Sequence, residues 1–166
     1  KFPILNSSLH QDKIIVKKYI NFGIAVESSK NLIVPVIHHS EEMSFWRLIK
    51  EIDVLIKRAR KGILTPEYIG GGTITISNAG SFGSILSTPI IYGNQSAILW
   101  MGKVTKHPVV NDNDQIKIRK IMNLCISYDH RIVDGSQVAQ FLKEISSRLE
   151  NPGGLLINEL IKEKLQ

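Results

Sequence analysis

Helical spacing of apolar residues is confined to two long stretches of this 166-residue sequence. In residues 44–60 apolar side chains recur at steps of three and four, and residues 135–149 repeat this spacing. Such a stripe covers one side of a helix and requires an apolar surface to pack against. Ser44 is placed to cap the first helix and Gly62 to end it. The remaining segments of the chain therefore have to supply the apolar surface.

Those remaining apolar segments are short and rich in β-branched residues, which is typical of strands. Pro35 interrupts one of them and predicts an edge or an end of pairing there. A short C-terminal helix is expected from about Leu155. The expected strands are residues 14–16, 22–26, 32–37, 73–77, 90–92 and 97–101, with one or two more within residues 116–128. This mixture predicts an α+β fold in one domain over residues 1–166, with a large mixed sheet and helices packed on one side.

Charge and composition restrict the possible partners. The net charge is +6, but the basic residues are scattered except at residues 57–61, where they would complement the end of the first helix. Because no zinc-finger or helix-turn-helix pattern accompanies them, no nucleic-acid partner is expected. No apolar run is long enough to cross a bilayer and no signal peptide is visible, so we expect no membrane partner. The expected location is the cytoplasm, or the mitochondrial matrix in a eukaryote.

Residues 127–135, Ser-Tyr-Asp-His-Arg-Ile-Val-Asp-Gly, carry the strongest chemical signal in the chain. They follow an apolar strand and precede a helix, a position from which side chains can face a cleft. Histidine is the side chain type most often used for proton transfer, which makes His130 a candidate general base. Asp134 can support the site electrostatically, and Gly135 permits a sharp turn into the helix. On these residues alone, a structural role for His130 stays the commoner alternative.

This segment resembles the His-x-x-x-Asp-Gly signature of the dihydrolipoamide acyltransferases. That family forms the core of 2-oxo acid dehydrogenase complexes and is related to chloramphenicol acetyltransferase. Further blocks resemble the family in the family's order, namely residues 2–6, 21–26, 32–36, 71–78 and 95–99. The resemblance covers nearly the whole chain and implies a chloramphenicol acetyltransferase-like fold. It also implies a partial catalytic domain that lacks its N-terminal segment, with the lipoyl and peripheral-subunit-binding domains outside this chain.

The resemblance implies roles for individual residues. His130 would take the proton from the thiol of coenzyme A or dihydrolipoamide, and Ser77 would donate a hydrogen bond to the oxyanion that forms. A strand-end cap is the alternative role for Ser77, and Thr88 is a less favoured competitor. Asp134 would pair with an arginine from the missing early part, whereas Arg131 would be a scaffold cation. Coenzyme A is thus a substrate, lipoamide arrives on a separate lipoyl domain, and no metal is expected.

The resemblance further implies homotrimers that build a larger cage. Each active site would lie between subunits, with His130 from one chain and Ser77 from its neighbour. Dehydrogenase (decarboxylase) and dihydrolipoamide dehydrogenase subunits would bind through domains outside this chain. Residues 123–127 and the serine at position 77 favour a branched-chain or acetyl group over succinyl. The alternatives are a chloramphenicol-type acetyltransferase and a non-catalytic, cage-forming core subunit, although such a subunit would tend to lose the histidine.

Three further positions carry expectations. Cys125 is the single cysteine and lies in an apolar run, which predicts a buried structural thiol. Trp100 stands where the family has a slender residue, and repacking is favoured there over a reshaped substrate channel. His38 and His39 are adjacent, but no third ligand follows at a suggestive spacing, so a solvated loop is favoured over a metal site.

Overall fold

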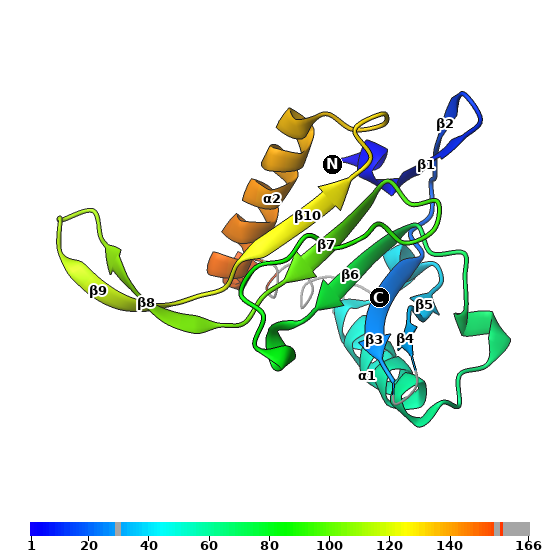
Figure 1. Cartoon of the computed structure of the whole chain (residues 1–166), viewed down its shortest axis with the longest axis horizontal. Coiled ribbons are helices and arrows are strands. Elements are labelled where there is room, and N and C mark those ends of the chain that lie inside the picture. Colours follow the sequence, from blue (N-terminus) through cyan, green and yellow to red (C-terminus); the bar gives the residue numbers. More distant parts are fainter. Residues whose placement is uncertain (29–30, 155–156, 158–166) are drawn as a thin grey trace.

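The computed structural model describes residues 1–28, 31–154 and 157 of the chain. A six-stranded mixed sheet in the order β10-β7-β6-β3-β4, with β5 also paired to β3, forms its centre (Figure 1). The strands of this sheet are β3 (Phe22–Glu27), β4 (Leu32–Ile33), β5 (Val36–Ile37), β6 (Ile74–Asn78), β7 (Ala97–Met101) and β10 (Leu124–Tyr128). Two separate hairpins are formed by β1 (Ser7–His10) with β2 (Lys13–Val16) and by β8 (Thr105–Val110) with β9 (Ile116–Ile121).

Both long helices pack on the same face of the central sheet, as the sequence predicts. The strand register places Ile24, Ile76, Leu99 and Ile126 in one row across β3, β6, β7 and β10. Ile24 and Ile76 belong to the core packed against α1 (Phe45–Lys61), and Ile126 belongs to the core packed against α2 (Gly135–Glu150). Because register partners point to the same side of a sheet, the two helices cover one face together (Figure 1).

Local signals set the ends of α1. The Ser44 hydroxyl accepts a hydrogen bond from the backbone N–H of Arg47 at 3.3 Å, and Gly62 ends the helix in the left-handed conformation with a φ of 68°. Leu55 and Ala59 are buried on the side that faces the sheet. The predicted cap, stripe and stop are therefore confirmed.

Helix α2 contacts the core mainly through its first half. Val138 is buried, and the ring of Phe141 packs edge-on against Phe2 with 5.5 Å between centroids. The prediction that Leu149 is buried is wrong, since its side chain is 54% exposed. The helix predicted from about Leu155 lies, apart from Ile157, outside the described residues.

Strand pairing departs from the prediction in four places, one of which is β8 (Thr105–Val110), a segment outside the predicted strand ranges. The segment predicted as one strand over residues 32–37 is two short strands, β4 and β5, on either side of Pro35, which lacks the N–H a ladder requires. Residues 90–92 form no strand, because no neighbouring strand pairs with them and Ile90 is 89% exposed. Strand β1 was not predicted, since its two serines break the apolar alternation.

The β8–β9 hairpin extends away from the rest of the described chain (Figure 1). Val110, Ile116 and Ile118 on this hairpin are each more than half exposed. None of the helices in the described part of the chain is long and apolar enough to cross a membrane.

Candidate active site

A tight turn after β10 presents His130 at the surface. Hydrogen bonds of the Asp129 backbone fix this turn: its N–H donates to the Ser96 carbonyl at 2.9 Å, and its carbonyl accepts from Ile132 at 2.9 Å and Val133 at 3.0 Å. Val133 is 1% exposed and anchors the turn in the core beneath α2. The rigid base of the turn therefore holds His130 in a defined place while its own side chain remains exposed.

The His130 imidazole lies beside the ring of Tyr128. The ring centroids are 5.5 Å apart and the planes are inclined by 38°. A Cβ atom on Gly135 would approach the Tyr128 hydroxyl to 3.2 Å, so the absence of a side chain there leaves room for the tyrosine. The imidazole is thus flanked by the Tyr128 ring, while the His130 side chain remains exposed.

Asp129 is engaged by Arg131 rather than by His130. The guanidinium donates to both carboxylate oxygens, with the shortest contact at 2.6 Å from Nη2 to Oδ2. The backbone N–H of Arg131 also donates to Oδ1, at 3.0 Å. These hydrogen bonds from Arg131 hold the pKa of Asp129 below its ordinary value. The arrangement is consistent with the predicted scaffold role of Arg131.

Asp134 occupies the N-cap position of α2. Its backbone carbonyl accepts the first helical hydrogen bonds, from Gln137 at 3.0 Å and Val138 at 3.2 Å. Its exposed carboxylate makes no capping hydrogen bond, and no arginine among the described residues forms an ion pair with it. A carboxylate at this helix end is favourable through the helix dipole. The expected arginine partner has no counterpart in the described part of the chain.

Ser77 lies at the far end of the sheet from His130. It is half-buried near the end of β6, between Ala25 of β3 and Trp100 of β7. It lines a cavity of about 1220 Å³ that is bounded by α1, the ends of β3 and β6, and the short 3-10 turn Gly80–Phe82. Thr88, the competing residue, is exposed and does not line this cavity.

A single chain does not bring Ser77 and His130 together. Ser77 is in register with Trp100, which pairs with Cys125, whereas His130 follows Tyr128 at the opposite end of β10. Three residues along β10 span about 10 Å, and two strand spacings add about 4.8 Å each across the sheet. Within one chain, Ser77 and His130 are therefore too far apart to contact the same reacting group.

Trp100 of β7 is the register partner of Ser77 on β6, and its side chain is buried at 2% exposure. A Cβ atom on Gly102 would meet its ring at 2.9 Å, so the ring rests against bare backbone. This packing is consistent with the predicted repacking. Cys125, its partner on β10, is half-buried rather than fully buried as predicted.

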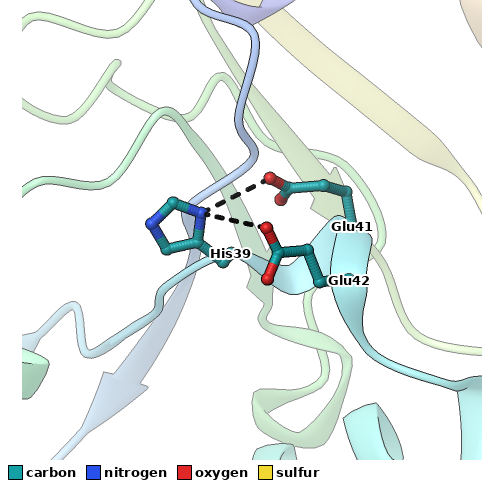
Figure 2. Close-up of side chains that lie close together, drawn as sticks. All are labelled: His39, Glu41 and Glu42. Atoms are coloured by element: carbon teal, nitrogen blue, oxygen red, sulfur yellow. Dashed lines mark ion pairs between the residues drawn. The ribbon is translucent and has the colours of Figure 1, made fainter.

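The histidine pair points in two directions. The Nε2 atom of His38 lies 3.0 Å from the Glu67 carbonyl, whereas the Nδ1 atom of His39 faces Glu41 at 3.6 Å and Glu42 at 3.8 Å (Figure 2). These two glutamates were not predicted as possible ligands, because neither stands at a conventional ligand spacing from the histidine pair. All three side chains are exposed, and exposed groups of this kind are common without an ion. The loop therefore remains a solvated loop in our interpretation.

The fold of the chain is that of the chloramphenicol acetyltransferase class. Chloramphenicol acetyltransferase itself superposes with a TM-score of 0.56 at 14% identity, over 89% of this chain and 70% of that one, which shows the fold alone. The chain belongs to the 2-oxoacid dehydrogenase acyltransferase (catalytic domain) family, whose model matches residues 1–157.

Relatives and solved structures agree with this assignment. The succinyltransferase components of the 2-oxoglutarate dehydrogenase complexes of Bacillus subtilis (strain 168) and Rickettsia conorii are 43% and 42% identical, over 95% and 94% of this chain. The chain spans only 38% and 39% of those two relatives. A probable dihydrolipoamide acetyltransferase from Listeria monocytogenes superposes with a TM-score of 0.84 at 43% identity, covering 90% of this chain and 63% of that one. The dihydrolipoamide acetyltransferase of Azotobacter vinelandii superposes with a TM-score of 0.86 at 34% identity, covering 93% of this chain and 64% of that one.

Proposed function

We propose that this chain transfers an acyl group between coenzyme A and dihydrolipoamide in the core of a 2-oxo acid dehydrogenase complex. The observation that carries the proposal is the exposed His130 on a fixed turn, within a chain that belongs to this acyltransferase family throughout residues 1–157. The dehydrogenase and dihydrolipoamide dehydrogenase subunits would bind through parts of the protein outside this chain.

The spacing of three residues supports their proposed roles. The Azotobacter vinelandii structure is described as an investigation of the roles of a serine, a histidine and an asparagine in the catalytic mechanism. In that protein the serine precedes the histidine by 52 residues, and the asparagine follows the histidine by four. Here Ser77 precedes His130 by 53 residues, and Asp134 follows His130 by four. An aspartate thus stands at the spacing of that asparagine, and its place at the N-cap of α2 suits a positioning role.

In the proposed reaction, His130 accepts the proton of the attacking thiol, whose thiolate fraction is small at neutral pH. The thiolate adds to the thioester carbonyl, and Ser77 of a neighbouring chain donates a hydrogen bond to the resulting oxyanion. The carbon–sulfur bond of the original thioester then breaks. The proton on His130 passes to the departing thiolate, so that one thiol and one thioester are consumed and one of each is formed.

The separation of Ser77 and His130 supports an assembly in which neighbouring subunits share each active site. We propose the trimer and the larger cage implied by the family, and a solved relative is described as the cubic core of a pyruvate dehydrogenase complex. The many exposed apolar side chains, including Phe82, Leu86 and Ile118, suit burial against other subunits. Light scattering with size exclusion tests this, and an active monomer would contradict a shared site.

For the acyl group we propose succinyl. The preference for a branched-chain or acetyl group, inferred from sequence, finds no support in the names of the curated relatives, which are succinyltransferases. Acetyl remains the comparison substrate, since two solved relatives are described as acetyltransferases.

The experiment mixes the protein with free dihydrolipoamide and succinyl-, acetyl- or isobutyryl-coenzyme A and follows thioester formation. Loss of a general base costs about 10²–10⁴ in rate, so His130→Ala is expected to lose activity by that factor. His10→Ala is the matched control, because this exposed histidine has no proposed role. Activity of His130→Ala equal to wild type, or no transfer by wild type, would refute the proposal.

A further inference from the structure

Arg60 is a basic residue of α1 that the fold does not explain. Two neighbours in residues 57–61 have structural partners: Lys57 pairs with Asp53, and the Arg58 guanidinium lies 5.7 Å from the centre of the Tyr68 ring. Arg60 is exposed and has neither an ion pair nor an aromatic partner among the described residues. Its guanidinium is therefore free to bind a ligand.

The helix points Arg60 toward the cavity that contains Ser77. Ile52, Ile56 and Arg60 are spaced by four residues and lie on one side of α1, and all three line this cavity. The two isoleucines pack against the core, and Arg60 continues their row where the core ends. The other charged residue lining the cavity, within the described chain, is Glu27.

The surroundings of Arg60 favour an anionic ligand of some length. Most of the cavity wall is apolar, with Val26, Ile76 and Phe82 among its lining residues. By strand alternation Ser77 points to the face opposite α1, so a ligand that reaches both residues passes around the end of β6. A guanidinium beside an apolar wall binds carboxylate or phosphate through two parallel hydrogen bonds.

We propose that Arg60 binds an anionic group of the substrate whose thioester carbonyl is held at Ser77, and that it determines substrate specificity there. This inference rests on the proposed function. The anionic group is either the free carboxylate of a succinyl group or a phosphate of coenzyme A, and the two sources predict different kinetics.

The test compares Arg60→Gln with Lys61→Gln, a matched control in the same helical turn. Lys61 is exposed, carries the same charge and does not line the cavity, so both variants lose the same interaction with the helix dipole. Arg60→Lys keeps the positive charge but removes the paired N–H donors of the guanidinium. It serves as the second variant if Arg60→Gln folds poorly. Each variant is assayed with succinyl- and acetyl-coenzyme A, and binding of both and of free coenzyme A is measured by equilibrium dialysis.

If Arg60 binds the succinyl carboxylate, Arg60→Gln lowers kcat/KM for succinyl-coenzyme A by about tenfold or more and leaves acetyl-coenzyme A unchanged. If it binds a phosphate, the KM for both thioesters and the Kd for free coenzyme A rise by about the same factor. Arg60→Lys gives an intermediate effect in either case. No change, or a change matched by Lys61→Gln, overturns the inference. Equilibrium dialysis measures binding and requires no turnover. An inactive wild type would therefore refute the proposed function, and the binding measurements would still decide whether Arg60 binds the anionic group.

Discussion

Thr73 and Thr75 offer a paired test of how buried hydroxyl groups stabilise this sheet. Both side chains are fully buried at 0% exposure, Thr73 immediately before β6 and Thr75 within it. The Thr73 hydroxyl accepts a hydrogen bond from the Asn21 N–H at 3.0 Å and donates to the Asn21 carbonyl at 3.3 Å. The Thr75 hydroxyl has no partner among the described residues. The same substitution to valine should therefore have opposite effects at the two positions.

The magnitudes follow from what each hydroxyl contacts. Thr73→Val leaves the buried Asn21 N–H without its acceptor, which costs about 1–3 kcal/mol of unfolding free energy. Thr75→Val removes a buried hydroxyl that has no partner among the described residues, a gain of about 1–3 kcal/mol before packing is considered. The hydroxyl oxygen occupies the space beside Gly23 that a Cβ would fill, and a methyl group there is slightly larger than a hydroxyl, which costs some packing energy. We therefore expect a net gain of about 1 kcal/mol.

Thermal unfolding at one fixed protein concentration, without ligand, measures both variants. At about 2–4 °C per kcal/mol for a chain of this size, Thr75→Val should raise Tm by about 2–4 °C. Thr73→Val should lower Tm by about 2 °C or more. Equal destabilisation by both substitutions would refute the reasoning, since the Thr75 hydroxyl would then have a partner from outside this chain.

Two further predictions concern the loop beside Trp100 and the turn that carries His130. A Cβ at Gly102 would lie 2.7 Å from the Ile85 carbonyl oxygen, so Gly102→Ala should lower the unfolding free energy by about 1–3 kcal/mol. Urea unfolding measures this change. Gly153→Ala is the control and should change the unfolding free energy little, because a Cβ there meets no other atom within 4 Å. Because Arg131 lowers the pKa of Asp129 in the folded state, the ionised carboxylate stabilises the fold above its ordinary pKa, and this contribution is lost as the pH falls through the lowered value. The unfolding free energy of Asp129→Asn should therefore fall less than that of the wild type between pH 7 and about pH 3. Urea unfolding of both proteins at each pH measures this, and an equal fall would show that the Asp129–Arg131 pair contributes nothing to stability.

The features predicted correctly from sequence depend on near neighbours. The helix over Phe45–Lys61 follows from apolar spacing, with Ser44 and Gly62 acting within one turn of its ends. Likewise, Pro35 divides a strand through its own missing N–H. Residues 90–92 were predicted as a strand from composition, yet a strand exists only where another strand pairs with it.

The parts of the site that were not predicted depend on distant contacts. The cavity joins Arg60 to Ser77 only because β6 pairs beside β3, the strand under α1. The Asp129–Arg131 ion pair was also missed, since residues two apart meet only in a turn as tight as this one. The fold class and the candidate residues could be inferred from the sequence, but the separation of Ser77 and His130 within one chain required the strand register.

The core beneath α2 joins the two ends of the described chain, and this has a consequence for folding during synthesis. Leu5 packs with Ala97, Val133 and Val138, and its carbonyl accepts a hydrogen bond from the Ser96 hydroxyl at 2.7 Å. Among the described residues, the members of the core beneath α1 extend no further along the chain than Ile76, so this core can form first on the ribosome. Leu5 must wait until Val138 has emerged, so the turn that carries His130 is among the last parts to become ordered. A translational pause between these two positions would therefore prolong exposure of the N-terminal segment, the state in which chaperones would be needed most.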